Sequence, residues 1–308
     1  MNYRRLGRTN LEVSEISLGT VELGMKYGIV LDGEPEEPSE ETAAKLLHRA
    51  LDLGVNFIDT ARLYGEAEAI IGRALKPRRH EFVLASKVPH FAAENLSPPA
   101  LRARVCESVE ESLRQLQTDV VDVMMIHSVS GAAVPYEVLF GILEDLRARG
   151  WVRFLGASVY GVETAIQVID SGFADCIQIA YSALDRRPEK HVLPLAAEKD
   201  VGIVARSVLL KGVLSPRRHA LPEPLSELKS LAGQLERLCD NLPELAYRYV
   251  LASPAVATAL VGTNHIEELE KAIQYASLGA LPEPLLDQLR MMRINNEELL
   301  NPATWPPL

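Results

Sequence analysis

The chain has 308 residues, of which 47% are hydrophobic and 24% are charged, and its formal net charge at pH 7 is −10. This composition is typical of a globular chain with a substantial core, and the acidic balance disfavours nucleic acid or an anionic membrane as a partner. No apolar run approaches the roughly 18 residues needed to cross a bilayer, and no signal-like apolar core follows the N-terminus. We therefore expect a cytoplasmic protein.

Short apolar runs alternate with helical patterns in the first half of the chain. The predicted strands cover residues 16–20, 55–59, 82–87 and 121–127, and each run is typical of a buried strand. The predicted helices cover 39–54, with Ser39 as the cap, and then 66–74, 97–116 and 136–149. These segments form four β/α units.

The alternation continues in the second half. The predicted strands cover residues 152–158, 176–180, 201–205 and 257–261, and the predicted helices cover 162–171, 192–199, 243–251 and 266–276. Two long connections interrupt the pattern. Residues 21–38, which contain several glycines and prolines, follow the first strand, and residues 208–242, with a predicted helix at 225–238, follow the seventh.

Alternating β and α elements imply a parallel sheet, either closed as a (β/α)8 TIM barrel or open and doubly wound. Eight units and polar residues at several strand ends favour the barrel, as a single α/β domain covering residues 1–308. We expect an N-terminal β-hairpin before the first barrel strand. We also expect long loops at the C-terminal face of the barrel, where pockets are usually built.

The turn after the first strand does not fit a dinucleotide-binding Gly-x-Gly-x-x-Gly motif. The segment from Gly19 to Gly24 lacks the second glycine and leads into a long loop. An open dinucleotide-binding sheet is therefore disfavoured, and a nicotinamide cofactor, if used, must bind in another geometry.

The cysteines offer no metal-binding pattern. Cys106, Cys176 and Cys239 are odd in number, widely separated, and lack the paired spacing of a zinc site or redox motif. We expect buried or incidental thiols and no metal.

Four polar side chains lie at or after the ends of three predicted strands. Asp59, Lys87 and His127 end the second, third and fourth strands, and Tyr64 lies in the loop after the second. Because barrel active sites lie at the C-terminal ends of the strands, we expect these four to converge at one mouth. A free tyrosine titrates near pH ~10, a nearby ammonium lowers that value, and a carboxylate keeps the ammonium charged. The set predicts a site for proton transfer.

The motifs around these residues resemble those of the aldo-keto reductase family. The matching segments follow the family order over nearly the whole chain, and jointly they are very specific. They are Gly54-Val55-Asn56-Phe57-Ile58-Asp59-Thr60-Ala61 with Tyr64-Gly65 and Glu68, Ala85-Ser86-Lys87, Met125-Ile126-His127, Gly156-Ala157-Ser158, Gln178 with Tyr181, and Val261-Gly262-Thr263.

The resemblance implies a barrel that binds NADPH or NADH in extended form and reduces carbonyls, or runs the reverse oxidation. It implies that Tyr64 donates the proton, that Lys87 and Asp59 activate Tyr64, and that His127 orients the substrate carbonyl. Ser158 and Gln178 would hold the nicotinamide carboxamide. The expected cofactor-binding residues are Gly19, Thr20, Asp59, Ser158, Gln178, Arg206, Ser207, Leu209, Gly262, Thr263, Asn264 and Glu268.

Two departures from the family pattern affect the nicotinamide end. Val159 stands where many members carry Asn or Asp, so one polar contact to the carboxamide is missing. Arg206 stands at the position where an aromatic residue usually stacks on the nicotinamide, and a guanidinium plane can take that place and adds a charge.

The cofactor tail departs as well. Relatives that prefer NADPH usually place Lys or Arg soon after the glycine of strand eight, whereas this chain offers only His265 there, and Lys271-Ala272 replaces a Glu-Asn pair. The basic residues Lys211, Arg217 and Arg218 could bind the pyrophosphate. Family frequency favours NADPH, and NADH is the alternative.

The leading hypothesis is an NAD(P)H-dependent oxidoreductase that reduces an aldehyde or ketone, or oxidises the corresponding alcohol or sugar hydroxyl. Its partner is a small molecule, and we expect a monomer or weak oligomer. One alternative is an aldolase or lyase that uses Lys87 as a Schiff-base nucleophile. Another is a regulatory barrel that binds the cofactor without turnover, although the intact set of four residues favours an enzyme.

Overall fold

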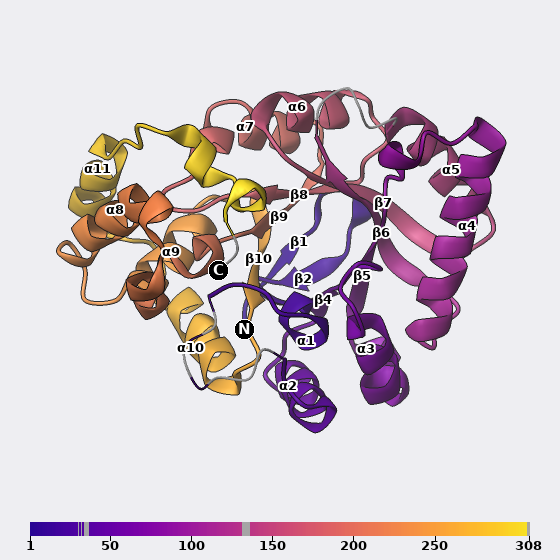
Figure 1. Cartoon of the computed structure of the whole chain (residues 1–308), viewed down its shortest axis with the longest axis horizontal. Helices are drawn as coiled ribbons and strands as arrows, with labels where there is room; N and C mark the ends of the chain where they lie inside the picture. Colours follow the sequence, from indigo (N-terminus) through magenta and orange to yellow (C-terminus); the bar gives the residue numbers. More distant parts are fainter. Residues whose placement is uncertain (30, 32, 34–36, 131–135, 307–308) are drawn as a thin grey trace.

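The computed structural model describes the whole chain except residues 30, 32, 34–36, 131–135 and 307–308. Eight parallel strands close into a barrel in the order β10, β3, β4, β5, β6, β7, β8, β9 (Figure 1). The predicted (β/α)8 barrel is confirmed. The barrel strands are β3 (Ile16–Gly19), β4 (Phe57–Asp59), β5 (Val83–Val88), β6 (Val121–Val129), β7 (Val152–Val159), β8 (Cys176–Ala180), β9 (Gly202–Arg206) and β10 (Val256–Gly262).

Helices surround the strands (Figure 1), and each predicted helix is present. The sequence analysis missed α1, in the first long loop, and α11, near the C-terminus. In the described part of the chain, no helix is long and apolar enough to cross a membrane. The helices are α1 (Val21–Gly24), α2 (Glu40–Asp52), α3 (Ala67–Leu75), α4 (Pro98–Gln115), α5 (Tyr136–Ala148), α6 (Val162–Asp170), α7 (Val192–Glu198), α8 (Ser226–Glu236), α9 (Leu242–Leu251), α10 (Ile266–Ala276) and α11 (Glu283–Met291).

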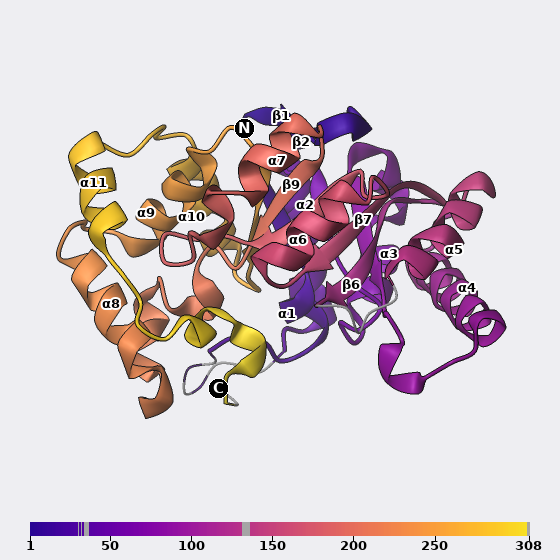
Figure 2. The same cartoon turned by 90° about the horizontal axis from the view of Figure 1, so that it is seen from above.

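The predicted N-terminal hairpin is confirmed and covers one end of the barrel. Strand β1 (Tyr3–Arg5) pairs with β2 (Glu12–Ser14) in antiparallel register. Leu6 and Val13 from this segment are fully buried and join the apolar cluster inside the barrel. In Figure 2 the hairpin lies at one end of the barrel, while α1 and the C-terminus lie toward the other. The end with α1 is therefore the open one.

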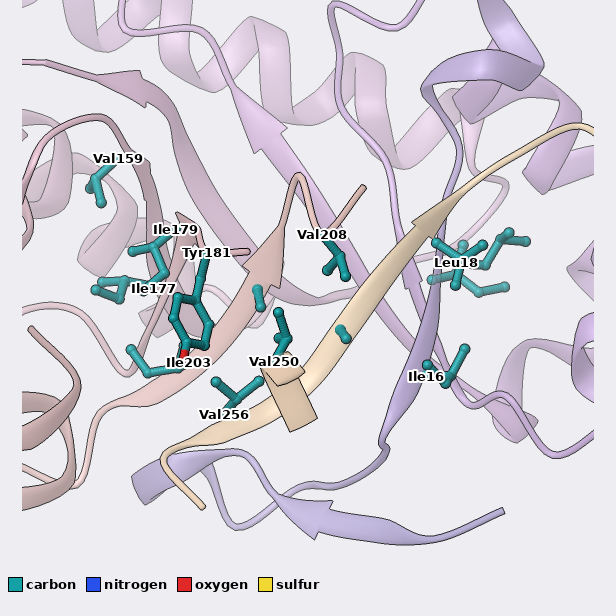
Figure 3. Close-up of a cluster of buried hydrophobic side chains, with 14 of the residues drawn as sticks. Ile16, Leu18, Val159, Ile177, Ile179, Tyr181, Ile203, Val208, Val250 and Val256 are labelled. Atoms are coloured by element: carbon teal, nitrogen blue, oxygen red, sulfur yellow. The ribbon is translucent and has the colours of Figure 1, made fainter. Parts of the chain in front are cut away.

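The core has two layers because successive side chains of a strand point to opposite faces. The larger cluster lies between the strands and the helices, and includes Ile177, Ile179 and Ile203 (Figure 3). The smaller cluster fills the barrel interior. This alternation then continues along each strand to a polar inward-facing position. Asp59 follows Phe57 by two residues, Lys87 follows Ala85, His127 follows Met125, and Gln178 follows Cys176.

The strand ends differ from the prediction in small ways that leave this alternation intact. Strand β4 begins at Phe57 and not at Val55, so it has only three residues, the last of which is Asp59. Strands β5 and β6 continue past Lys87 and His127, which makes both side chains part of the sheet itself. Lys87 is in register with Met125 of β6, whereas the register between β6 and β7 shifts between Ile126 and Val129, so His127 lies at an irregularity of the sheet.

A buried carboxylate joins two strands at the opposite end. Asp122, at the start of β6, accepts hydrogen bonds from the backbone N–H of Leu84 at 2.9 Å, from Arg79 at 2.6 Å and from Arg153 at 2.5 Å. The Asp122 side chain is only 5% exposed. This network contributes to the stability of the barrel and not to ligand binding, because the N-terminal face of a barrel is remote from the strand ends where ligands bind.

We predict that Asp122→Ala lowers the free energy of unfolding by about 2–4 kcal/mol, because it leaves the buried N–H of Leu84 without its acceptor and removes the carboxylate that pairs with Arg79 and Arg153. The control is Asp145→Ala, which removes the exposed Arg102–Asp145 pair and should cost about 0–1 kcal/mol. Urea unfolding followed by circular dichroism measures both variants. Equal losses would contradict the role given to Asp122.

Candidate active site

A cavity of about 750 Å³ opens at the C-terminal ends of the barrel strands. This volume lies within the range of about 300–1,000 Å³ that is usual for ligand sites. Both predicted long loops line the cavity, with Val21 and Ile29 from the first and Val208 and Gly212 from the second. The predicted site residues that line it are Gly19, Thr20, Asp59, Tyr64, His127, Ser158, Gln178, Arg206, Ser207, Leu209, Gly262, Asn264 and Glu268.

Lys87 lies behind the cavity wall and not on it. Its side chain is fully buried, and its Nζ donates to both oxygens of Asp59 at 2.8 and 2.7 Å and to the carbonyl oxygen of Thr60 at 2.9 Å. The Tyr64 hydroxyl oxygen lies 3.4 Å from the same nitrogen. The ammonium thus joins a carboxylate that lines the cavity to a phenol that lines it.

The loop that carries Tyr64 packs closely against α1. Gly65 has a φ of +52°, and a Cβ there would lie 2.0 Å from the carbonyl oxygen of Gly24. A Cβ on Gly24 would in turn lie 2.1 Å from the carbonyl oxygen of Tyr64. Glycine is required at both positions because any side chain would force the two segments apart. The pair of glycines holds the Tyr64 backbone against the first long loop.

The pKa of Tyr64 is raised, and not lowered as expected for a tyrosine activated by a lysine. Burial alone would lower the pKa of Lys87, but the charges and hydrogen bonds of Asp59 and Tyr64 together outweigh burial and raise it, so Lys87 stays charged. Burial raises the pKa of Tyr64 above 10.0, and Lys87 offsets this only in part, while Asp59 adds to it. The expectation of a lowered tyrosine pKa is therefore wrong for this state, because desolvation exceeds the attraction of an ammonium already paired with a carboxylate.

His127 lies beside Tyr64, with the two ring centroids 5.6 Å apart and the planes at 80°. Burial, followed by the positive charges of Lys87 and Arg206, lowers the pKa of His127 from 6.5 to about 3. Its buried Nδ1 has no hydrogen-bond partner within the described part of the chain. The imidazole is therefore neutral at physiological pH and can donate one hydrogen bond to an oxygen in the cavity.

Ser158 and Gln178 lie side by side at the ends of β7 and β8, where their backbones are in register. The Nε2 of Gln178 donates to Asp59 at 2.8 Å, a contact that the sequence analysis did not foresee. Neither the Gln178 carbonyl oxygen nor the Ser158 hydroxyl bonds to another described residue. These groups can accept from and donate to an amide in the cavity.

The basic residues of the second long loop line the outer part of the cavity. Lys211, Arg217 and Arg218 are all found there. Arg217 donates to the carbonyl oxygen of Ile29 at 3.0 Å and so connects the two long loops. Arg218 is buried and forms an ion pair with Glu236. The predicted basic cluster is therefore part of the cavity wall.

Thr263 is the one predicted cofactor-binding residue that does not line the cavity. It is fully buried, and its hydroxyl donates to Glu268 at 2.6 Å. The Arg217 guanidinium lies 3.6 Å from the same carboxylate. Thr263 thus positions Glu268, and Lys271, one turn further along α10, also lines the cavity.

A second cavity of about 890 Å³ adjoins the first and shares His127 and Ser128 with it. Leu63, Pro89 and Phe91 contribute apolar surface to its wall. A ligand in the main cavity can extend into this space past His127.

Several aromatic residues of the main cavity were missed by the sequence analysis, namely Tyr27, Tyr160, Tyr247 and Tyr275. Tyr160 follows Ser158 by two residues, so its position after a strand end was a usable signal. Tyr247 and Tyr275 come from α9 and α10, and only the packing of these helices brings them to the cavity.

The comparison with known proteins agrees with this geometry. The model of the aldo/keto reductase family matches residues 15–292. The chain belongs to the aldo/keto reductase family. Members are oxidoreductases that use nicotinamide cofactors. The chain is therefore a member of an oxidoreductase family.

Three similar proteins cover nearly the whole chain. The uncharacterized oxidoreductase YqkF of Bacillus subtilis is 29% identical over 310 residues, which is 94% of this chain and 96% of that protein. The L-galactose dehydrogenase of Arabidopsis thaliana is 29% identical over 325 residues, or 99% and 97% of the two chains. Among solved structures, the holo form of the aldo-keto reductase AKR11C1 from Bacillus halodurans has a TM-score of 0.78 at 30% identity, covering 94% and 95%.

We predict that His127 does not titrate between pH 5 and 8, because its pKa lies near 3. Since the unfolded chain takes up a proton at this residue near pH 6.5 and the folded chain only near 3, His127 lowers stability as the pH falls between these values. NMR of protein with labelled histidine measures the titration, with His127→Gln to assign the signal. A midpoint between pH 5 and 8 would show that the site is better solvated than the structure indicates.

Proposed function

We propose that the protein reduces small aldehydes or ketones with NADPH, with NADH as the alternative cofactor, or oxidises the corresponding alcohol or sugar hydroxyl. The observation that carries the proposal is the contact chain from Asp59 through Lys87 to Tyr64 at the cavity wall, with a neutral His127 beside it. A cytoplasmic location and a monomeric or weakly oligomeric state remain predictions.

The residues of the site suit the proton transfer in such a reaction. When bound, NADPH supplies the hydride that adds to the carbonyl carbon and is itself oxidised. Tyr64 gives its proton to the carbonyl oxygen as the C=O π bond breaks, and the phenolate left behind lies 3.4 Å from the Lys87 ammonium. A proton from solvent restores the phenol. His127 donates a hydrogen bond that orients the same oxygen.

The cavity also fits the polar groups of the cofactor. The Ser158 hydroxyl and the Gln178 carbonyl oxygen can hold the carboxamide. Lys211 and Arg217 line the outer part of the cavity and suit the pyrophosphate. The N-terminus of α10, which begins at Ile266, adds backbone donors near Asn264.

The balance of charge near α10 supports NADPH. Glu268 would repel a 2′-phosphate, but its carboxylate accepts from Thr263 at 2.6 Å and lies 3.6 Å from Arg217. Lys271 contributes a positive charge at the same place. We infer that Lys271 is the basic partner of the phosphate, although it lies later in the sequence than the family pattern suggests.

The structure disfavours the Schiff-base alternative. A Schiff base needs a neutral amine that a carbonyl substrate can reach. Lys87 is fully buried, does not line the cavity, and keeps its proton because Asp59 raises its pKa. A regulatory barrel stays an alternative in principle, but it has no use for a buried ammonium beside a phenol.

We predict that Tyr64→Phe lowers turnover of a carbonyl substrate at least 100-fold, since it removes the proton donor, while the dissociation constant of NADPH changes little. Tyr3→Phe is the matched control. It removes a tyrosine hydroxyl in the distant hairpin, which donates to the carbonyl oxygen of Gly54. Steady-state kinetics and fluorescence titration measure the two effects. Near-normal turnover in Tyr64→Phe would contradict the assignment.

We predict that NADPH binds more tightly than NADH and that Lys271→Ala weakens NADPH binding about fivefold, as expected for a partly exposed ion pair, with little change for NADH. Lys199→Ala, which removes an exposed lysine just before β9, serves as the control. Separate calorimetric titrations of the two cofactors give the values. An equal loss for both cofactors would place Lys271 away from the 2′-phosphate.

A further inference from the structure

Arg206 holds a fixed position at the catalytic end of the main cavity. Its guanidinium carbon lies 4.3 Å from the centroid of the Tyr160 ring. One terminal nitrogen donates to the carbonyl oxygen of Val159 at 3.1 Å, and the other donates to the hydroxyl of Ser207 at 3.2 Å. The two departures from the family pattern, Val159 and Arg206, are therefore in direct contact. The tyrosine ring and the two oxygens together set the direction of the guanidinium.

The charge of Arg206 is not balanced by a carboxylate. Its partners are a ring, a carbonyl and a hydroxyl, and no acidic side chain pairs with it in the described part of the chain. Four other cations near the cavity are paired with carboxylates, whereas Lys211, in the second long loop, lies over the rings of Tyr27 and Trp305. Lys87 is paired with Asp59, Arg62 with Glu68, Arg217 with Glu268 and Arg218 with Glu236. Among the described residues around Ser158 and Gln178, Arg206 thus contributes a positive charge that no carboxylate neutralises.

The field of this charge reaches the reacting groups. Arg206 contributes to the lowering of the His127 pKa, after burial and Lys87, and it acts on Tyr64 in the same direction. Arg206 lines the same cavity as Ser158 and Gln178, the two residues that suit the nicotinamide carboxamide. A nicotinamide bound there lies in the field of the guanidinium.

We propose that Arg206 makes this site select the reduced cofactor over the oxidised one. This inference rests on the proposed function. The dihydronicotinamide ring is uncharged and can stack on a guanidinium plane, whereas the oxidised ring carries a positive charge that an unpaired arginine repels. The site is then loaded with reduced cofactor even when the oxidised form is abundant, and the oxidised product leaves readily. The cost is that Arg206 opposes the positive charge that develops on the ring during hydride transfer.

The test is to measure the dissociation constants of NADPH and NADP⁺ by calorimetry in the wild type and in three variants. Arg206→Met removes the charge and keeps much of the side-chain volume, Arg206→Lys keeps the charge, and Arg102→Met removes an arginine from an exposed surface pair. We expect the wild type to bind NADPH about tenfold more tightly than NADP⁺, the size of effect expected for a like charge about 5 Å away in a partly solvated cavity. Arg206→Met should remove most of this ratio, while the other two variants keep it.

The outcomes are distinct. An unchanged ratio in Arg206→Met, with both cofactors still bound, overturns the role of Arg206 and leaves the proposed function intact. A wild type that binds neither cofactor overturns the proposed function and this inference with it. Circular dichroism spectra and unfolding midpoints close to those of the wild type confirm that Arg206→Met is folded.

Discussion

The buried ion pair between Asp59 and Lys87 is the interaction on which the site depends. Burying an isolated ammonium in a barrel is costly, and an ion pair offsets that cost only where further hydrogen bonds complete it. Here the carbonyl of Thr60 accepts from Lys87, and Gln178 donates to Asp59. Three strands and the loop after β4 therefore contribute to a single polar cluster. Tyr64 is attached to that cluster through Lys87, and so the position of the phenol depends on the same pair.

Burial and nearby charges together determine the protonation states of the residues in the cavity. Desolvation keeps Tyr64 protonated, as its proposed role of proton donor requires, and the proposed phenolate would be stabilised by Lys87. Desolvation also keeps His127 neutral, which suits its proposed role of orienting a carbonyl oxygen by a hydrogen bond. Arg206 adds a charge with no carboxylate partner among the described residues. Tyr64 and His127 are thus held in the protonation states that the proposed reduction needs.

Much of the fold and of the catalytic set could be predicted from the sequence, because local patterns determine them. Apolar runs with polar ends placed Asp59, Lys87 and His127 at strand ends, and the two-residue alternation of a strand turned them inward. Contacts between distant segments could not be read in this way. Three contacts depend on how α10 packs against the second long loop. They are the pairing of Arg217 with Glu268, the hydrogen bond from Thr263 to Glu268 and the position of Lys271 on the cavity wall. The raised pKa of Tyr64 depends on burial, which no motif reports.

The most direct test of the account is a crystal structure of the protein with bound NADPH. The account predicts the nicotinamide in the main cavity, with its carboxamide on Ser158 and Gln178, beside a Tyr64 hydroxyl that stays within hydrogen-bonding distance of the Lys87 nitrogen. Cofactor bound outside this cavity, or a Lys87 side chain turned away from both Asp59 and Tyr64, would contradict it.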